Sequence, residues 1–185
     1  MEETVDVVVL VDEEGAPIGT APRAQVHDAH TPLHLAFSCY LFDGSGRLLM
    51  TRRAVTKRTW PGVWTNSFCG HPRPGETLED AVRRHARHEL GTEVSHVRCV
   101  LPGFRYRAVD AGGVVENELC PVFVATSSHG AEAIGANPDE VAEWQWITPG
   151  ELESAIDAAP WALSPWLLEQ HRELSLVGDW AEGQR

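Results

Sequence analysis

The chain has 185 residues, of which 43% are hydrophobic and 23% charged, and this balance excludes a wholly disordered protein. It contains no run near the about 18 apolar residues of a membrane-spanning helix, and its acidic start Met1-Glu2-Glu3 does not resemble a secretory signal. The net charge of -12 argues against nucleic-acid or membrane-surface partners, although a local basic cluster can still bind a small anion.

Short apolar runs dominate the first part of the chain. Residues 5–11 predict a buried strand that ends at an acidic turn. Residues 35–42 and 47–51 predict two strands, because the segment between them, Asp43-Gly44-Ser45-Gly46, is typical of a hairpin turn. Pro61-Gly62 predicts a further turn.

The spacing of apolar residues predicts a helix over residues 77–90. Thr77 is a suitable N-cap, with Asp80 completing an imperfect capping box, and Leu78 and Val82 lie on one stripe. Gly91 follows as the expected C-cap, so both ends of this helix are specified locally.

Further elements follow the central helix. Strands are expected over residues 97–101, 104–109, 114–126 and 142–147, and helices over residues 149–158 and from Ser164-Pro165 onward. Strands on both sides of a central helix, joined mostly by hairpins, indicate an α+β fold with a mixed sheet. The length suits a single domain over residues 1–185, with a flexible tail after about residue 175.

The four cysteines show no CxxC spacing. We therefore expect no disulfide framework and a cytoplasmic location. Cys39, Cys99 and Cys120 are expected to serve only in packing.

Glu116 and Glu118 are spaced so that a strand directs both carboxylates to one face, beside Val114 and Cys120. Two like charges on a partly apolar surface are unfavourable unless a cation lies between them or one is protonated. The alternative is an acidic edge strand exposed to solvent.

Three histidines, His27, His34 and His71, precede the central helix, and Pro32 prevents one unbroken helix from joining the first two. Together with the two carboxylates they make a suitable ligand set for an octahedral divalent ion. Their spacing does not show that they converge, and each is equally suited to a surface or core position.

The segment from residue 70 to residue 91 has the frame of the Nudix box, a loop–helix–loop that holds a divalent ion against a diphosphate. The matching residues are Gly70, Glu76, Arg84, Glu89 and Gly91. A typical box has glutamates where this chain has His85 and His88, which weakens hydrolysis as a function. A plain amphipathic helix is the structural alternative.

Several longer segments are more specific: TRRA at 51–54, WPGVWTNSFCGHP at 60–72, FRYRA at 104–108, ENE at 116–118 and PWALSPW at 160–166. In this order they closely resemble the type I isopentenyl-diphosphate isomerases, which are Nudix-fold enzymes of isoprenoid biosynthesis. The resemblance runs from about residue 7 to residue 166 and implies a Nudix-like α/β/α sandwich.

The resemblance implies that Cys69 and Glu118 form the catalytic pair. Tyr106 matches a tyrosine that orients the glutamate, and Trp161 matches a tryptophan that faces the reacting carbon. Taken singly, Cys69 is equally a buried structural thiol or a zinc ligand, and the two aromatic residues are equally core residues.

The resemblance also implies two metal sites. The ligands of the first ion, Mn²⁺, Zn²⁺ or Mg²⁺, correspond to His27, His34, His71, Glu116 and Glu118. A Mg²⁺ ion bridged to the substrate diphosphate corresponds to the backbone oxygen of Cys69 and the carboxylate of Glu89. The residues that match diphosphate contacts are Arg23, Arg53 and Lys57, while His85 stands where some relatives have an arginine that Arg83 or Arg84 would have to replace.

The implied activity is the isomerisation of isopentenyl diphosphate to dimethylallyl diphosphate, and we expect the protein to act as a monomer. An unactivated alkene must be protonated to a tertiary carbocation, which then loses a proton from another carbon, so two acid/base groups are needed. We expect Glu118 to deliver the proton to C4 and the Cys69 thiolate to take the proton from C2. The alternatives are a Nudix hydrolase of a nucleoside diphosphate derivative and a non-catalytic metal-binding protein on the same fold.

Overall fold

The computed structural model describes residues 6–128, 134–178 and 180–181. Within these ranges, no helix is both long enough and apolar enough to cross a membrane. Val5, the first residue of the first expected strand, lies outside the described residues.

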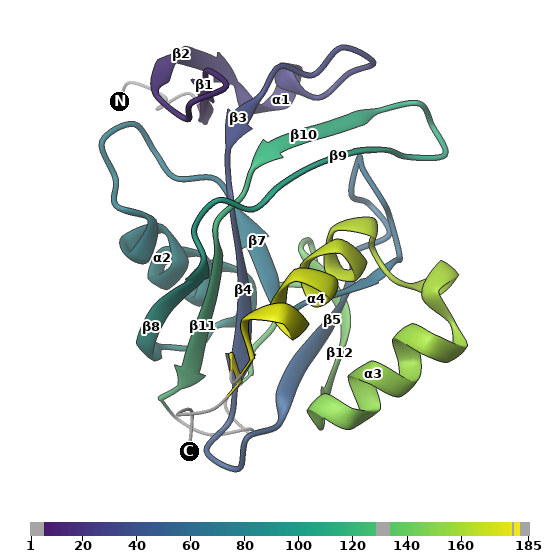
Figure 1. Ribbon diagram of the computed structural model, residues 1–185. Helices are drawn as coiled ribbons and strands as arrows, with labels where there is room; N and C mark the ends of the chain where they lie inside the picture. Colours follow the sequence, from purple (N-terminus) through teal and green to yellow (C-terminus); the bar gives the residue numbers. More distant parts are fainter. Residues whose placement is uncertain (1–5, 129–133, 179, 182–185) are drawn as a thin grey trace.

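The larger of two sheets has seven strands, in the order β12-β5-β4-β11-β8, with β6 paired to β5 and β7 paired to β4 (Figure 1). The strands are β4 (Phe37–Phe42), β5 (Leu48–Arg53), β6 (Trp64–Thr65), β7 (Phe68–Gly70), β8 (Val94–Leu101), β11 (Val122–Ser127) and β12 (Val141–Ile147). β11 pairs with β4 in parallel and with β8 antiparallel, so the sheet is mixed, as expected.

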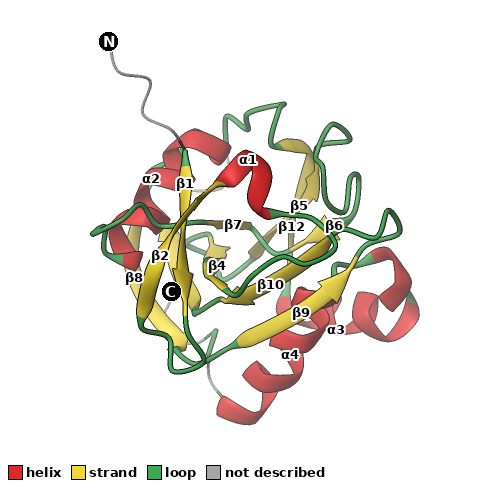
Figure 2. Cartoon of the chain, turned by 90° about the horizontal axis from the view of Figure 1, so that it is seen from above, coloured by secondary structure: helices red, strands yellow, loops and turns green. Residues whose placement is uncertain are grey.

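The second sheet has five strands in the order β2-β1-β3-β10-β9, seen from above in Figure 2. They are β1 (Val7–Val11), β2 (Pro17–Pro22), β3 (His34–Leu35), β9 (Arg105–Val109) and β10 (Val115–Leu119). The solvent-exposed, proline-bounded β2 was not expected from the sequence. The single strand expected over residues 114–126 was wrong, because the chain breaks at Cys120-Pro121 and passes from β10 in one sheet to β11 in the other. Proline has no N–H to donate to a ladder and commonly ends a strand.

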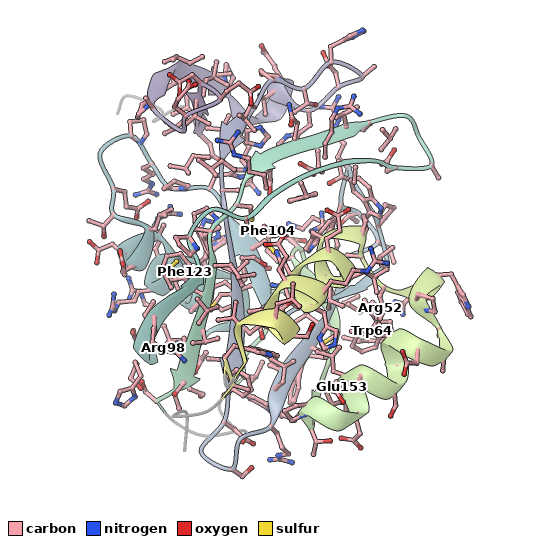
Figure 3. The ribbon with its side chains drawn as sticks, viewed as in Figure 1. Arg52, Trp64, Arg98, Phe104, Phe123 and Glu153 are labelled. Atoms are coloured by element: carbon pink, nitrogen blue, oxygen red, sulfur yellow. The ribbon has the colours of Figure 1, made fainter. Side chains whose placement is uncertain are left out.

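Helices cover both faces of the larger sheet. Alternate residues of β4 point to opposite sides: Tyr40 and Phe42 join the core cluster that includes Trp166, Leu167 and Leu174 of α4. Cys39 and Leu41 join the cluster around α2, and Figure 3 marks one residue from each cluster, Phe104 and Phe123. This α/β/α arrangement confirms the expected sandwich.

Local capping explains where the longer helices begin and end. α2 (Leu78–Leu90) starts at Thr77, whose side chain accepts a hydrogen bond from the Asp80 amide, and ends at Gly91 with a left-handed φ of 61°. α3 (Pro149–Ala158) has a complete capping box at Thr148, and α4 (Pro165–Val177) starts at Ser164. All three helices were expected with these starts.

The remaining short elements are α1 (Arg23–Val26) and a 3-10 turn, η1 (Pro160–Ala162). The tail expected after about residue 175 overlaps the end of α4 and otherwise falls partly outside the described residues. All four cysteines are free; Cys39 and Cys120 are fully buried in the two core clusters.

Candidate active site and metal centre

A cavity of about 570 Å³ brings most of the expected site residues together. Its walls come from both sheets: Glu116, Glu118 and Tyr106 on the strands of the smaller sheet, and Cys69 and Arg53 on those of the larger. Residues that are far apart in the chain therefore face one space.

Three histidines and one glutamate converge at this cavity. His34 meets Glu118 because β3 pairs in parallel with β10 and places these two residues in register. His71 directly follows β7, and His27 directly follows α1. One ligand atom from each of His27, His34, His71 and Glu118 lies within 4.8 Å of all the others.

The distances within this cluster are those of groups that share one small space. Glu118 Oε1 lies 3.2 Å from His71 Nε2 and 3.5 Å from His34 Nε2. The ring centroid of His34 lies 5.1 Å from those of both His27 and His71. Such closeness of basic rings around a buried carboxylate matches a ligand set better than a packed core.

Several buried atoms of the cluster make no hydrogen bond of acceptable geometry within the described part of the chain, although some have a polar atom of the cluster nearby: His27 Nε2, His34 Nε2, His71 Nδ1 and Glu116 Oε2. Buried polar atoms are normally paired, because an unpaired one costs about 1–3 kcal/mol. Nitrogen and oxygen donors left open in one place fit a divalent metal ion. The cluster is therefore a possible metal-binding site.

Glu116 lies beside this group rather than inside the mutual contact set. Its Oε2 is 3.1 Å from His27 Nε2, and its Oε1 accepts a hydrogen bond of 2.8 Å from Thr59 Oγ1. Both glutamates are buried, and β10 lies between β3 and β9. The alternative of a solvent-exposed acidic edge strand is therefore wrong.

The histidines beside Glu118 determine the pKa of its carboxyl. Burial alone would raise the pKa of this carboxyl, but His34 and His71 outweigh burial and leave the pKa well below its usual range. Tyr106 faces Glu118 across the β9–β10 pair, and burial raises the pKa of Tyr106 well above its usual range. Glu118 is thus a carboxylate and Tyr106 a neutral phenol.

Cys69 lines the same cavity from β7. Burial raises the pKa of its thiol to about 12, although Ser38 and Asn66 act in the other direction. The negative charge of Glu118 adds to this rise in the pKa of Cys69. At neutral pH the proton of this pair therefore lies on sulfur.

The three expected cationic residues all line the cavity. Arg53 donates to the carbonyl oxygens of Thr59 and Trp60, and its guanidinium lies 5.5 Å from the ring centre of Trp166. Lys57 pairs with Glu140, and burial lowers the pKa of Lys57 to about 8 despite the nearby carboxylates. Arg23 forms an exposed ion pair of 3.1 Å with Asp6.

The central helix carries the part of the site that departs from the Nudix frame. His85 is buried, and its Nδ1 lies 2.7 Å from Glu89 Oε1. A side chain at position 70 would collide with the His85 ring at 2.4 Å, so the buried His85 leaves room only for glycine there. His85 thus holds Glu89 rather than reaching the main cavity, and Arg84 is paired with Glu76 at 2.6 Å and lines a neighbouring cavity.

Two expected site residues do not line the cavity: His34, which lies behind it against Glu118, and Trp161, which lies away from the site. Trp161 lies in η1 with 85% of its surface exposed. Trp166, at the start of α4, lines the cavity instead, together with Phe68. Both tryptophans belong to the PWALSPW segment, and only the fold distinguishes them.

Sequence reasoning also missed Thr59 and Glu140. Thr59 bonds Glu116, and Glu140 pairs with Lys57 while lining the cavity. Thr59 lies in a loop and Glu140 just before β12, and neither belongs to a recognisable motif. No sequence signal identified them.

The model of the NUDIX domain matches residues 32–167 of the chain. A crystal structure of a protein from Deinococcus radiodurans superposes with a TM-score of 0.69 at 24% identity, covering 91% of this chain and 99% of that one. The MutT protein from Methanosarcina mazei Go1 superposes with a TM-score of 0.56 at 16% identity, covering 78% of this chain and 94% of that one. These likenesses establish the Nudix fold.

Curated relatives are more similar in sequence. An isopentenyl-diphosphate Delta-isomerase of Brevibacterium linens is 60% identical over 92% of this chain and 92% of its own length. The proteins of the same name from Leifsonia xyli subsp. xyli and Agromyces mediolanus are 59% and 56% identical, covering 96% and 98% of this chain and 96% and 86% of their own lengths. The chain belongs to the isopentenyl-diphosphate Delta-isomerase family, a family with a NUDIX domain.

Proposed function

We propose that this protein isomerises isopentenyl diphosphate to dimethylallyl diphosphate in isoprenoid biosynthesis. The observation that carries the proposal is the placement of Cys69 and Glu118 on the two sheets that wall one cavity. A thiol and a carboxyl can each give or take a proton, and the reaction needs one proton donor and one proton acceptor. Family membership supports the same activity.

The two groups exchange protons with the substrate in opposite senses. One protonates C4 of the alkene and gives a tertiary carbocation, and the other removes a proton from C2, so the double bond moves without net change in composition. We assign the first step to Glu118, oriented by Tyr106. For this step Glu118 must carry a proton, and Cys69 must have given up its own proton before it accepts one from C2.

We propose that His27, His34, His71, Glu116 and Glu118 hold one divalent ion, Mn²⁺, Zn²⁺ or Mg²⁺. Their open nitrogen and oxygen atoms support this assignment. When bound, the ion supplies positive charge beside the Glu118 carboxyl. A Mg²⁺ ion with the substrate diphosphate is assigned to Glu89 and the backbone oxygen of Cys69, where His85 keeps the Glu89 carboxylate in place.

The diphosphate is assigned to Arg23, Arg53 and Lys57, which supply local positive charge in a chain of net charge -12. The apolar part of the substrate then faces Phe68 and Trp166. These rings keep water from a carbocation that water would trap as an alcohol. Trp161 receives no role, because it is exposed outside the cavity.

The deciding experiment is incubation of the purified protein with isopentenyl diphosphate and Mg²⁺ plus Mn²⁺. We expect acid-labile dimethylallyl diphosphate and no release of phosphate. Release of phosphate or pyrophosphate without the isomer would favour a Nudix hydrolase. Metal binding without turnover would favour a non-catalytic protein. The hydrolase is less well supported, because His85 and His88 replace glutamates of the helix.

We also propose that residues 1–185 form one domain that acts as a cytoplasmic monomer, without nucleic-acid or membrane partners. The free cysteines and the acidic net charge support this description. Size-exclusion chromatography with light scattering tests the monomer, and an elution at twice the chain mass would refute it.

A further inference from the structure

A buried polar chain lies behind the sulfur of Cys69. Ser38 Oγ is 3.3 Å from Cys69 Sγ, because β4 and β7 pair with these two residues in register. Asn66 Oδ1 is 3.5 Å from the same sulfur. Ser38 and Asn66 are fully buried, so the sulfur has polar neighbours that solvent does not reach.

The amide of Asn66 can have only one orientation. The indole Nε1 of Trp166 donates to Oδ1 at 3.1 Å, and an indole nitrogen is never an acceptor. On the other side, the two protons of Nδ2 are shared among three acceptors, which are the carbonyl oxygens of Cys39 and Phe68 at 3.0 and 3.1 Å and the hydroxyl of Ser38. The contact of 2.8 Å between Asn66 Nδ2 and Ser38 Oγ is therefore one in which Ser38 accepts.

This leaves Ser38 with one proton and two possible acceptors. Gln170 Oε1 lies 3.1 Å away and Cys69 Sγ 3.3 Å away. Gln170 Oε1 also accepts a hydrogen bond of 3.0 Å from Tyr40. If the Ser38 hydroxyl turns toward the sulfur, Gln170 keeps Tyr40 as a donor, so no buried acceptor is left unpaired.

We propose that Ser38 is a positioning residue for Cys69: its hydroxyl, held by Asn66, is the buried hydrogen-bond partner that keeps the sulfur in place at the cavity wall. Ser38 does not line the cavity and acts only through Cys69. The inference rests on the proposed function, in which Cys69 exchanges a proton with the substrate.

The structure offers a matched control two residues along the same strand. Ser38 and Tyr40 are both fully buried and both donate to Gln170 Oε1 in the observed network. Only Ser38 also contacts the sulfur. Ser38→Ala and Tyr40→Phe therefore remove equivalent bonds to Gln170 but differ in their effect on Cys69.

The first measurement is the steady-state isomerisation of isopentenyl diphosphate by the wild type and both variants, below the lowest melting temperature. We expect Ser38→Ala to lower kcat by about 10-fold with KM within about 2-fold, and Tyr40→Phe to keep kcat within about 2-fold. Equal kcat values in the two variants would overturn the proposal. Ser38→Gly also removes the hydroxyl and serves with the same expectation if Ser38→Ala does not fold.

The second measurement does not depend on isomerase activity. Iodoacetamide alkylation of Cys69 is followed at one fixed pH by mass spectrometry of the peptide that contains it. We expect a rate in Ser38→Ala that differs several-fold from that of the wild type and an unchanged rate in Tyr40→Phe, because only the first substitution removes a side chain that holds the sulfur in place. If the wild type forms no dimethylallyl diphosphate, the proposed function fails, while equal alkylation rates would separately refute the role of Ser38.

Discussion

The two walls of the cavity differ in how their polar atoms are satisfied. On the smaller sheet, His34 and Glu116 leave buried atoms without hydrogen-bond partners in the described chain. On the larger sheet, Ser38 and Asn66 surround Cys69 with a network in which each has defined partners. Of the atoms of this network, only Gln170 Nε2 at its far end makes no hydrogen bond within the described chain. The first wall is suited to an added ion, whereas the second positions its sulfur with protein atoms alone.

The site therefore combines two kinds of preorganisation, open ligand atoms on one wall and a hydrogen-bonded network on the other. Open donors gain their stabilisation only when an ion binds, so that wall should respond to metal. A satisfied network contributes to the stability of the fold at all times, so that wall should respond to mutation of its hydrogen bonds. Metal removal and single substitutions should therefore affect the two walls differently.

The largest effect is expected from removing the acid/base group of either wall. Glu118→Gln and Cys69→Ser should each lower isomerisation by roughly 100-fold or more, because a positioned proton donor or acceptor contributes about 10²–10⁴-fold. Activity with isopentenyl diphosphate measures the loss, and circular dichroism checks that the fold is intact. A variant with a near-normal rate would remove its residue from the mechanism.

Metal removal should show that the wall on the smaller sheet depends on an ion and the wall on the larger sheet does not. Addition of Mn²⁺ at 100 to 1,000 times its dissociation constant is expected to stabilise the chelator-treated protein by about 3–4 kcal/mol, because the ion binds the folded state. Thermal unfolding with and without EDTA measures the effect. His27→Asn should lose most of the response and Ser38→Ala should keep it; an equal response in the wild type and His27→Asn would contradict the metal site.

The satisfied wall should be sensitive to loss of Asn66. Asn66→Ala leaves the buried Trp166 indole without an acceptor and removes the donor to the Ser38 hydroxyl, so we expect a loss of about 2–3 kcal/mol in the free energy of unfolding. Urea unfolding measures it. Asn117→Ala, at a partly buried residue that donates to the carbonyl of Thr31, should cost less than about 1 kcal/mol. Equal losses in the two variants would show that the hydrogen bonds of Asn66 contribute no more to stability than that of Asn117.

The smallest effect is expected from Glu76, outside both walls. The hydrogen bonds of Arg84 lower the pKa of Glu76 to about 2 from the ordinary 4.5. Because the folded pKa is the lower one, this pair stabilises the protein above pH 4.5 and loses its contribution as the pH falls toward 2. Glu76→Gln should cost about 1–2 kcal/mol at pH 7, and the difference from the wild type should shrink on acidification. A pH-independent difference would contradict this assignment.

Much of the fold could be predicted from local signals. Thr77 and Gly91 mark the ends of α2, and Ser164-Pro165 marks the start of α4, because caps act within a few residues. The hairpin turn at residues 43–46 was equally recognisable. The break at Pro121 was missed although proline commonly ends a strand, and the assignment of the two halves to different sheets depends on pairing with strands distant in the chain.

The candidate site was predicted through longer motifs rather than through spacing. The TNSFCGHP and ENE segments drew attention to Cys69, His71, Glu116 and Glu118, and all four residues line the cavity. Trp161 was expected there through its motif, yet Trp166 occupies the cavity wall. The two residues differ only in whether η1 or α4 carries them, which depends on how α4 packs against the larger sheet.

By itself, the sequence determined the helix ends, most strands and the chemical types of the site residues, because these depend on neighbours within a few positions or on motifs read in order. Only the tertiary structure decided that His34 stands opposite Glu118, that Ser38 lies behind Cys69 and that Glu140 pairs with Lys57. Each of these contacts joins strands or loops that are distant in the chain, and strand register is set by packing of the whole sheet.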